Sequence, residues 1–128
     1  MGMEKNYDIL IVEDIPSWQR TLTRYLQGES LTIFIASNYQ EALNLVETKT
    51  FDLVILDVNL TGVTGNYDGL RIADDLWSRN TGVKIIILSG TSDSERYFKG
   101  RDFKPSCVLK KQTLEPDEFI KEIYKALT

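Results

Sequence analysis

The chain has 128 residues and a formal net charge of -4, because 19 acidic residues outnumber 15 basic ones. This length suits one domain with a real hydrophobic core, and the acidic balance argues against a general nucleic-acid binder, whose affinity comes from clustered lysine and arginine. The absence of histidine excludes Ser-His-Asp and Cys-His catalysis, His-ligated zinc and phosphohistidine carriage within this chain.

Five short apolar runs alternate along the chain with segments of helical period. Strands that read as continuous apolar runs are usually covered on both faces, which predicts a parallel sheet between layers of helices. The expected strands cover residues 7–12, 31–36, 51–56, 83–88 and 107–109.

Apolar residues recur at helical spacing between these strands. Pro16 fits the first turn of the first helix, whose inward face includes Trp18. The second helix is expected around residues 39–46, the third over about 70–79, and the last just after Pro116. The order βαβαβαβαβ predicts an α/β protein with a doubly wound, five-stranded parallel sheet, that is, a (βα)5 flavodoxin-like three-layer sandwich.

The whole chain, residues 1–128, is expected to form a single domain, with residues 1–6 flexible or left over from cloning. The single cysteine, Cys107, cannot form an internal disulfide, which suits a reducing compartment and a role as a small buried apolar residue. No apolar stretch approaches the ~20 residues of a membrane span, and the first residues lack a signal-peptide core. We therefore expect a cytoplasmic protein without membrane insertion.

Polar side chains lie at the ends of four predicted strands. Glu13 and Asp14 follow the first strand, Asp57 the third, Ser89 the fourth and Lys110 the fifth. In open α/β sheets ligands bind beyond the carboxyl ends of the strands. Carboxylates held close together repel one another unless a hard cation such as Mg²⁺ or a lysine offsets their charge. Each residue alone is compatible with a helix cap, a strand end or a solvated charge, but their joint occurrence at one edge favours a binding site.

This set of five residues, in order over nearly the whole chain, resembles the receiver domain of two-component response regulators. The resemblance implies that Asp57 is the phosphoacceptor, taking a phosphoryl group from a phosphohistidine of a separate histidine kinase or histidine phosphotransfer protein. It also implies that Lys110 pairs with the phosphoryl group and that the Ser89 hydroxyl donates a hydrogen bond to it. The implied cofactor is Mg²⁺, with ligands Glu13, Asp14, Asp57 and the backbone carbonyl of Asn59.

The resemblance further implies a role in a phosphorelay. Phosphorylation adds about 1.5 to 2 negative charges and is expected to switch a protein-interaction surface. The expected partners are the phosphodonor protein and a downstream protein target or further domains of a longer chain, with no direct contact to nucleic acid. Apart from self-dephosphorylation, no turnover of an external substrate is expected.

Four features depart from the family pattern. The loop after Asp57 is about four residues longer than usual. Lys111 follows Lys110 where the family commonly has proline. Cys107, three places before Lys110, replaces an aromatic switch residue. Residues 92–105 lack a sustained apolar period, so the helix there is expected to be short or mobile.

Six basic side chains against one acid fall within residues 96–111. They are explained either by a solvated face or by a docking surface for an acidic protein segment.

Three other functions compete with a phosphorylatable receiver. A receiver-like scaffold that binds partners constitutively would have lost Asp57, the acidic pair or Lys110, and none is lost. Residues 61–66 look like the FMN-phosphate loop of a flavodoxin, but in flavodoxins that loop follows the first strand. A phosphatase that forms an aspartyl phosphate needs a second aspartate at the position of Asn59.

Overall fold

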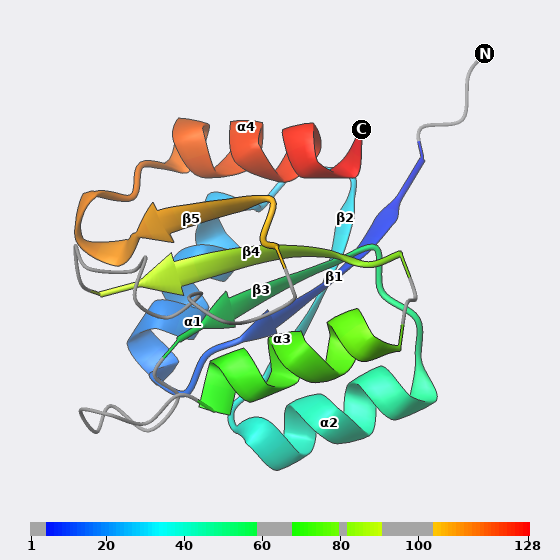
Figure 1. The fold of residues 1–128 in the computed structure, drawn as a ribbon. Coiled ribbons are helices and arrows are strands. Elements are labelled where there is room, and N and C mark those ends of the chain that lie inside the picture. The colour runs from blue at the N-terminus through cyan, green and yellow to red at the C-terminus, as the bar shows by residue number, and fades with distance from the viewer. Residues whose placement is uncertain (1–4, 59–67, 80–81, 91–103) are drawn as a thin grey trace.

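A single parallel sheet lies at the centre of the computed structural model, which describes residues 5–58, 68–79, 82–90 and 104–128 (Figure 1). Its strand order is β2-β1-β3-β4-β5, and every neighbouring pair is parallel. The predicted doubly wound five-stranded sheet is therefore confirmed. The strands are β1 (Tyr7–Val12), β2 (Leu31–Ala36), β3 (Leu53–Asp57), β4 (Lys84–Ser89) and β5 (Cys107–Lys110).

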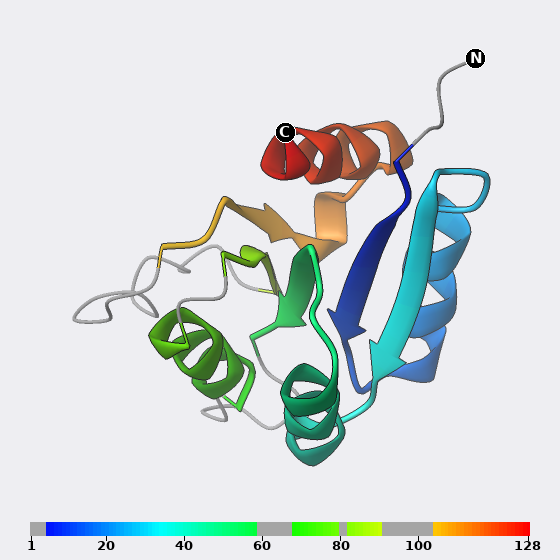
Figure 2. The same ribbon diagram turned by 90° about the vertical axis from the view of Figure 1, so that its right-hand side faces the viewer.

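Helices cover both faces of the sheet, which gives three layers. Helices α1 and α4 lie on one face, and α2 and α3 lie on the other (Figure 2). A short 3-10 turn, η2, directly follows β5. The helical elements are α1 (Pro16–Tyr25), α2 (Tyr39–Thr48), α3 (Asp68–Ser78), η2 (Lys111–Thr113) and α4 (Pro116–Leu127).

The alternation of side chains along the strands divides the core into two clusters. In β1, Ile9 and Ile11 pack toward α1 and α4, whereas Leu10 and Val12 pack toward α2 and α3. All four side chains are buried, and full burial of such a side chain contributes about 1.5 to 3 kcal/mol. Because helices cover both faces, the inner strands β1, β3 and β4 are mostly apolar, whereas the edge strand β2 has exposed positions at Thr32 and Ile35.

Short connections at the carboxyl edge of the sheet set the position of the candidate site. Only Glu13, Asp14 and Ile15 separate β1 from α1, which starts with Pro16. Helix α2 begins after Asn38, whose side-chain oxygen accepts a hydrogen bond from the backbone N–H of Glu41 at 2.8 Å. Because only three residues connect β1 to α1, the backbone of Glu13 and Asp14 is held close to the carboxyl end of β1.

Strand β3 begins at Leu53, two residues later than predicted. Asp52 stands just before it, where its Oδ2 accepts a hydrogen bond from the backbone N–H of Asp8 at 2.8 Å. The weak helix expected within residues 92–105 falls mostly outside the described residues. None of the helices in the described ranges is both long and apolar enough to cross a membrane.

Cys107 lies half-buried at the start of β5 and packs against the cluster beneath α1 and α4. Burial, followed by the nearby charge of Glu122, raises the pKa of its thiol to about 12. The thiol is therefore protonated near pH 7. The predicted burial of Cys107 is only partial.

Candidate functional site

Three carboxylates meet at the carboxyl ends of two neighbouring strands. Glu13 and Asp14 follow β1, and Asp57 ends β3, which pairs with β1 in parallel. One carboxylate oxygen from each residue lies within 4.8 Å of the other two. The structure thus brings together the three acidic side chains that the strand pattern predicted at this edge.

Burial makes this cluster electrostatically unusual. Glu13 has no exposed surface and Asp57 is only 5 % exposed. Burial, and then the charge of Asp57, raise the pKa of Glu13 to about 7, although Lys111 partly offsets both effects. Burial is also the main cause that raises the pKa of Asp14, and Asp57 adds to it. The cluster therefore holds negative charge at a cost that a bound cation would relieve.

The lysine beside these carboxylates is Lys111. Its ammonium nitrogen lies 2.7 Å from Glu13 Oε2 and 3.2 Å from Asp57 Oδ2, and the residue is only 9 % exposed. Lys110, the lysine assigned to the site from the sequence, is exposed. The structure therefore corrects this assignment from Lys110 to Lys111.

The end of β5 explains why the second of two adjacent lysines faces the carboxylates. Lys110 is the last residue of β5 and pairs with Ser89 across the ladder. Lys111 begins η2, where the chain leaves the extended conformation and turns across the carboxyl edge of the sheet. Alternation along a strand predicts the faces of the strand residues, but it does not extend into such a turn.

Neighbouring contacts hold η2 in this place. The side chain of Gln112 donates a hydrogen bond to the backbone carbonyl of Gly90, just beyond β4. The backbone N–H of Leu114 donates to the carbonyl of Lys111 at 3.3 Å. With the lysine reassigned, Gln112 takes the position where the family commonly has proline, and it connects η2 to the end of β4.

Hydrogen bonds and an ion pair orient Glu13, whereas one buried oxygen of Asp14 has no such contact among the described residues. Glu13 Oε1 accepts the backbone N–H of Ile15 at 3.2 Å, and Gln19 donates to the Glu13 backbone carbonyl at 2.6 Å. Glu13 Oε2 forms an ion pair with the Lys111 ammonium at 2.7 Å. Asp14 Oδ1 is buried and has no hydrogen-bond partner within the described ranges. Oxygens with unused lone pairs are suitable ligands for a hard cation.

Ser89 lies at the same edge of the sheet. It ends β4 and is 1 % exposed, and the residue before it, Leu88, pairs with Asp57 in the ladder between β3 and β4. The position three places before the reassigned lysine is Val108 rather than Cys107. Val108 is half-buried and is likewise not aromatic.

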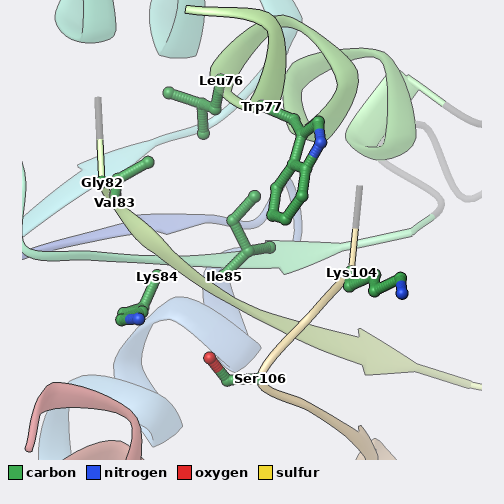
Figure 3. A pocket seen from close by; sticks show the side chains of 8 residues that line it. All are labelled: Leu76, Trp77, Gly82, Val83, Lys84, Ile85, Lys104 and Ser106. Atoms are coloured by element: carbon green, nitrogen blue, oxygen red, sulfur yellow. The ribbon is translucent and has the colours of Figure 1, made fainter. Parts of the chain in front are cut away.

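The cavities formed by described residues alone are not lined by the three carboxylates. A cavity of about 420 Å³ lies instead near the amino ends of β4 and β5, lined by Trp77, Lys84, Ile85 and Lys104 among others (Figure 3). Small ligands often occupy such hollows, but a phosphoryl group and a metal ion require charged oxygens and an ammonium group rather than volume. Chemistry rather than shape therefore identifies the carboxylate cluster.

Several predicted features fall outside the described residues. These are the Asn59 carbonyl, most of the long loop after Asp57, and half of the basic run. Of that run, Lys104 and Lys110 are described as exposed, whereas Lys111 belongs to the carboxylate cluster. The sequence interpretation did not identify Lys111, Gln112 or the contact of Trp18 with Lys111; a pattern of strand ends contains no signal for them.

Comparison with known proteins adds an independent observation. The response regulator receiver domain family matches residues 9–124. The KDP operon transcriptional regulatory protein KdpE of Escherichia coli K12 is 35 % identical over 106 residues, which are 81 % of this chain and 44 % of that protein. The TorCAD operon transcriptional regulatory protein TorR of the same organism is 32 % identical over 87 residues, 68 % of this chain and 36 % of that protein. The chain thus spans less than half the length of both relatives.

A solved structure of a response regulator also matches, over nearly the whole of this chain. The response regulator protein TrrA of Thermotoga maritima, in complex with Mg²⁺-BeF, matches with a TM-score of 0.76 and 30 % identity. The match covers 94 % of this chain and 99 % of that one. Receiver domains are phosphoacceptors. These matches favour a receiver domain over the flavodoxin and phosphatase alternatives. From its fold, its acidic cluster and these matches, the chain belongs to the receiver domain family of two-component response regulators.

Proposed function

We propose that this receiver domain binds Mg²⁺ at Glu13, Asp14 and Asp57 and accepts a phosphoryl group on Asp57. The observation that carries the proposal is the cluster of three carboxylates, two of them buried and Asp14 half-buried, with one oxygen of each within 4.8 Å of the others. Asp14 Oδ1, which has no hydrogen-bond partner among the described residues, and the oxygens of Glu13 and Asp57 that Lys111 contacts supply the hard ligands that Mg²⁺ prefers. The backbone carbonyl of Asn59 is proposed as a further ligand. In support, the TrrA structure is described as a complex with Mg²⁺-BeF.

The proposed transfer uses Asp57 as the nucleophile. One of its carboxylate oxygens attacks the phosphorus of a phosphohistidine, and the bond from phosphorus to the imidazole nitrogen breaks with its electron pair retained by the imidazole. When bound, Mg²⁺ would neutralise charge on the carboxylate and phosphoryl oxygens. The Lys111 ammonium, 3.2 Å from Asp57 Oδ2, stands ready to pair with the arriving phosphoryl oxygens.

Ser89 and Lys111 are proposed to respond to the phosphorylation of Asp57. The Ser89 hydroxyl at the end of β4 donates a hydrogen bond to the phosphoryl group, while Lys111 leaves Glu13 for the new negative charge. Neither Cys107 nor Val108 supplies the aromatic side chain of the usual family switch, so the change reaches the surface through other groups. A downstream protein, or further domains of a longer chain, would bind that surface.

The proposed partners define the setting of the reaction. The proposed phosphodonor is a histidine kinase or a histidine phosphotransfer protein in the cytoplasm. The phosphohistidine must belong to another protein, because this chain has no histidine of its own. The domain accepts a phosphoryl group and releases it by hydrolysis, without turnover of an external phosphate ester.

Intact-mass measurement with a small phosphodonor such as acetyl phosphate tests this proposal. We expect one Mg²⁺-dependent adduct, stable in acid and labile in base, on the wild-type protein and on the control Asp52→Asn, and none on Asp57→Asn. An adduct that persists on Asp57→Asn would assign the chemistry to another residue. A wild-type protein that stays unmodified would favour a receiver-like scaffold that works without phosphorylation.

A further inference from the structure

Trp18 covers the ammonium group of Lys111. Trp18 is a half-buried residue of α1, and Lys111 Nζ lies over its ring at 5.0 Å from the ring centre. The same nitrogen contacts Glu13 Oε2 at 2.7 Å and Asp57 Oδ2 at 3.2 Å. The ammonium group is thus held by two carboxylates and by the face of an indole.

The surroundings place this cation–π contact at the strong end of its range. Tryptophan attracts a cation more than the other aromatic side chains do, and the attraction grows where water is excluded. Lys111 is only 9 % exposed, and Glu13 has no exposed surface at all. Little solvent is therefore available to screen the charge of the ammonium group from the ring.

Lys111 occupies oxygens that a divalent cation also needs. Glu13 and Asp57, its two carboxylate partners, belong to the cluster of three acidic residues. A cation that binds there must draw these oxygens away from the ammonium group. Any contact that stabilises Lys111 in this position therefore weakens the binding of the competing cation.

We propose that Trp18 is a positioning residue, which holds Lys111 against Glu13 and Asp57 and thereby lowers the affinity of the cluster for Mg²⁺. This inference rests on the proposed function, in which the cluster binds Mg²⁺. In this arrangement the cluster binds Mg²⁺ less tightly, and the Lys111 ammonium group already lies beside Asp57 before a phosphoryl group arrives. Trp18 acts only through Lys111, so its influence on the metal disappears when the ammonium group is removed.

Isothermal titration of Mg²⁺ into the full chain tests the inference with a double-mutant cycle. We expect Trp18→Leu to tighten Mg²⁺ binding about fivefold and Trp18→Phe, which keeps a weaker ring, about twofold. Lys111→Met, which removes the competitor, tightens binding by about tenfold or more. In the Lys111→Met background, Trp18→Leu causes no further change.

Two controls separate this effect from damage to the fold. Trp77→Leu removes the other tryptophan of the chain, which is 44 % exposed and lines the cavity at the opposite end of the sheet, and leaves the Mg²⁺ affinity unchanged. Thermal unfolding followed by circular dichroism confirms that each variant is folded. If Trp18→Leu does not fold, Trp18→Phe in the wild-type and Lys111→Met backgrounds gives the same test at smaller amplitude.

The outcomes distinguish the inference from the proposed function. A wild-type protein that takes up no Mg²⁺ refutes the proposed function and, with it, the inference. If Mg²⁺ binds but the Trp18 variants leave its dissociation constant unchanged, only the inference fails. It also fails if Trp18→Leu changes the dissociation constant equally with and without Lys111.

Discussion

Strands β1 and β3 carry similar residues at both of their ends. At the amino ends, Lys49 Nζ lies 3.1 Å from Asp8 Oδ2, and Asp52 lies just before β3. At the carboxyl ends, Lys111 pairs with Glu13 and Asp57. Aromatic rings accompany both lysines: Phe34 and Phe51 lie near Lys49 at 5.0 Å and 5.8 Å, and Trp18 lies near Lys111 at 5.0 Å.

The difference between the two ends is burial. Lys49 and Asp8 leave 35 % and 34 % of their side chains exposed, whereas Lys111, Glu13 and Asp57 leave 9 %, 0 % and 7 %. We call the group at the amino ends the exposed cluster and the group at the carboxyl ends the buried cluster. Solvent screens the exposed cluster, so its ion pair contributes about 0 to 1 kcal/mol.

The roles of the carboxylates differ as well. In the exposed cluster, Asp52 Oδ2 accepts the backbone N–H of Asp8 at 2.8 Å and so ties the segment before β3 to β1. In the buried cluster, a third carboxylate, Asp14, adds charge, and one of its buried oxygens has no hydrogen-bond partner in the part of the chain that the structure describes. The same residue types therefore stabilise the fold at one end and form a candidate binding site at the other.

The largest expected effect concerns two neighbouring lysines. Lys111→Met should slow phosphorylation by a small phosphodonor about a hundredfold to a thousandfold, because it removes a positioned charge that stabilises the transferring group. The matched substitution Lys110→Met should change the rate by less than about twofold, because that side chain is exposed. Single-turnover phosphorylation rates measure both effects, and a larger loss in Lys110→Met would reverse the lysine assignment.

The lysine pair also shows what the sequence could predict and what it could not. The limits of β1 and β2 agree with the predicted ranges 7–12 and 31–36, because polar residues border each of these mostly apolar runs on both sides. The meeting of Glu13, Asp14 and Asp57 followed from the same pattern, since parallel strands end at one edge.

The positions of the Lys111 and Trp18 side chains at the site could not be predicted from the sequence, for a physical reason. The strand period assigns residues to faces only up to Lys110, and η2 then turns the chain by an amount that no residue pattern specifies. The contact between Trp18 and Lys111 joins α1 to η2, far apart in sequence, and depends on how both elements pack. Such contacts come from tertiary structure rather than from local periodicity.

The second prediction is a loss of stability as pH rises in metal-free buffer. Folding raises the pKa of Glu13 from 4.5 to about 7, so between these values the folded protein keeps a proton that the unfolded chain has released. The free energy of unfolding should therefore fall as pH rises from below 4.5 to above 7, by at most about 3 kcal/mol from this residue. Urea unfolding across this range measures the fall.

Glu13→Gln is the control for this titration. The variant has no carboxyl group to titrate at this position, so most of the loss should disappear, and a smaller part due to the raised pKa of Asp14 should remain. An unchanged pH profile in Glu13→Gln would show that other groups cause the dependence. Saturating Mg²⁺ should also flatten the wild-type profile, because the ion stabilises the ionised carboxylates.

The third prediction compares metal binding at the two clusters. Glu13→Gln should weaken Mg²⁺ binding about tenfold, because the buried cluster loses one of its three charges. Asp52→Asn in the exposed cluster should leave the affinity unchanged. Calorimetric titration of both variants decides the point, and equal losses would mean that Mg²⁺ is bound through the overall charge of the chain.

The smallest expected effect lies in the exposed cluster. Lys49→Met should lower the free energy of unfolding by about 0.5 to 1 kcal/mol, through the lost ion pair with Asp8 and the lost cation–π contacts. The loss should shrink at high salt, and Mg²⁺ affinity should not change. Urea unfolding at two salt concentrations measures it, and a loss of several kcal/mol would show that burial does not separate the two clusters.

Chemical trapping of the phosphorylated residue tests the central claim most directly. Borohydride reduces an aspartyl phosphate to homoserine, and peptide mass spectrometry then identifies the converted position. After treatment with a phosphodonor and Mg²⁺, we expect homoserine at position 57 and unchanged aspartate at position 52. Conversion at position 52 or at Asp14, or no conversion at all, would contradict the account.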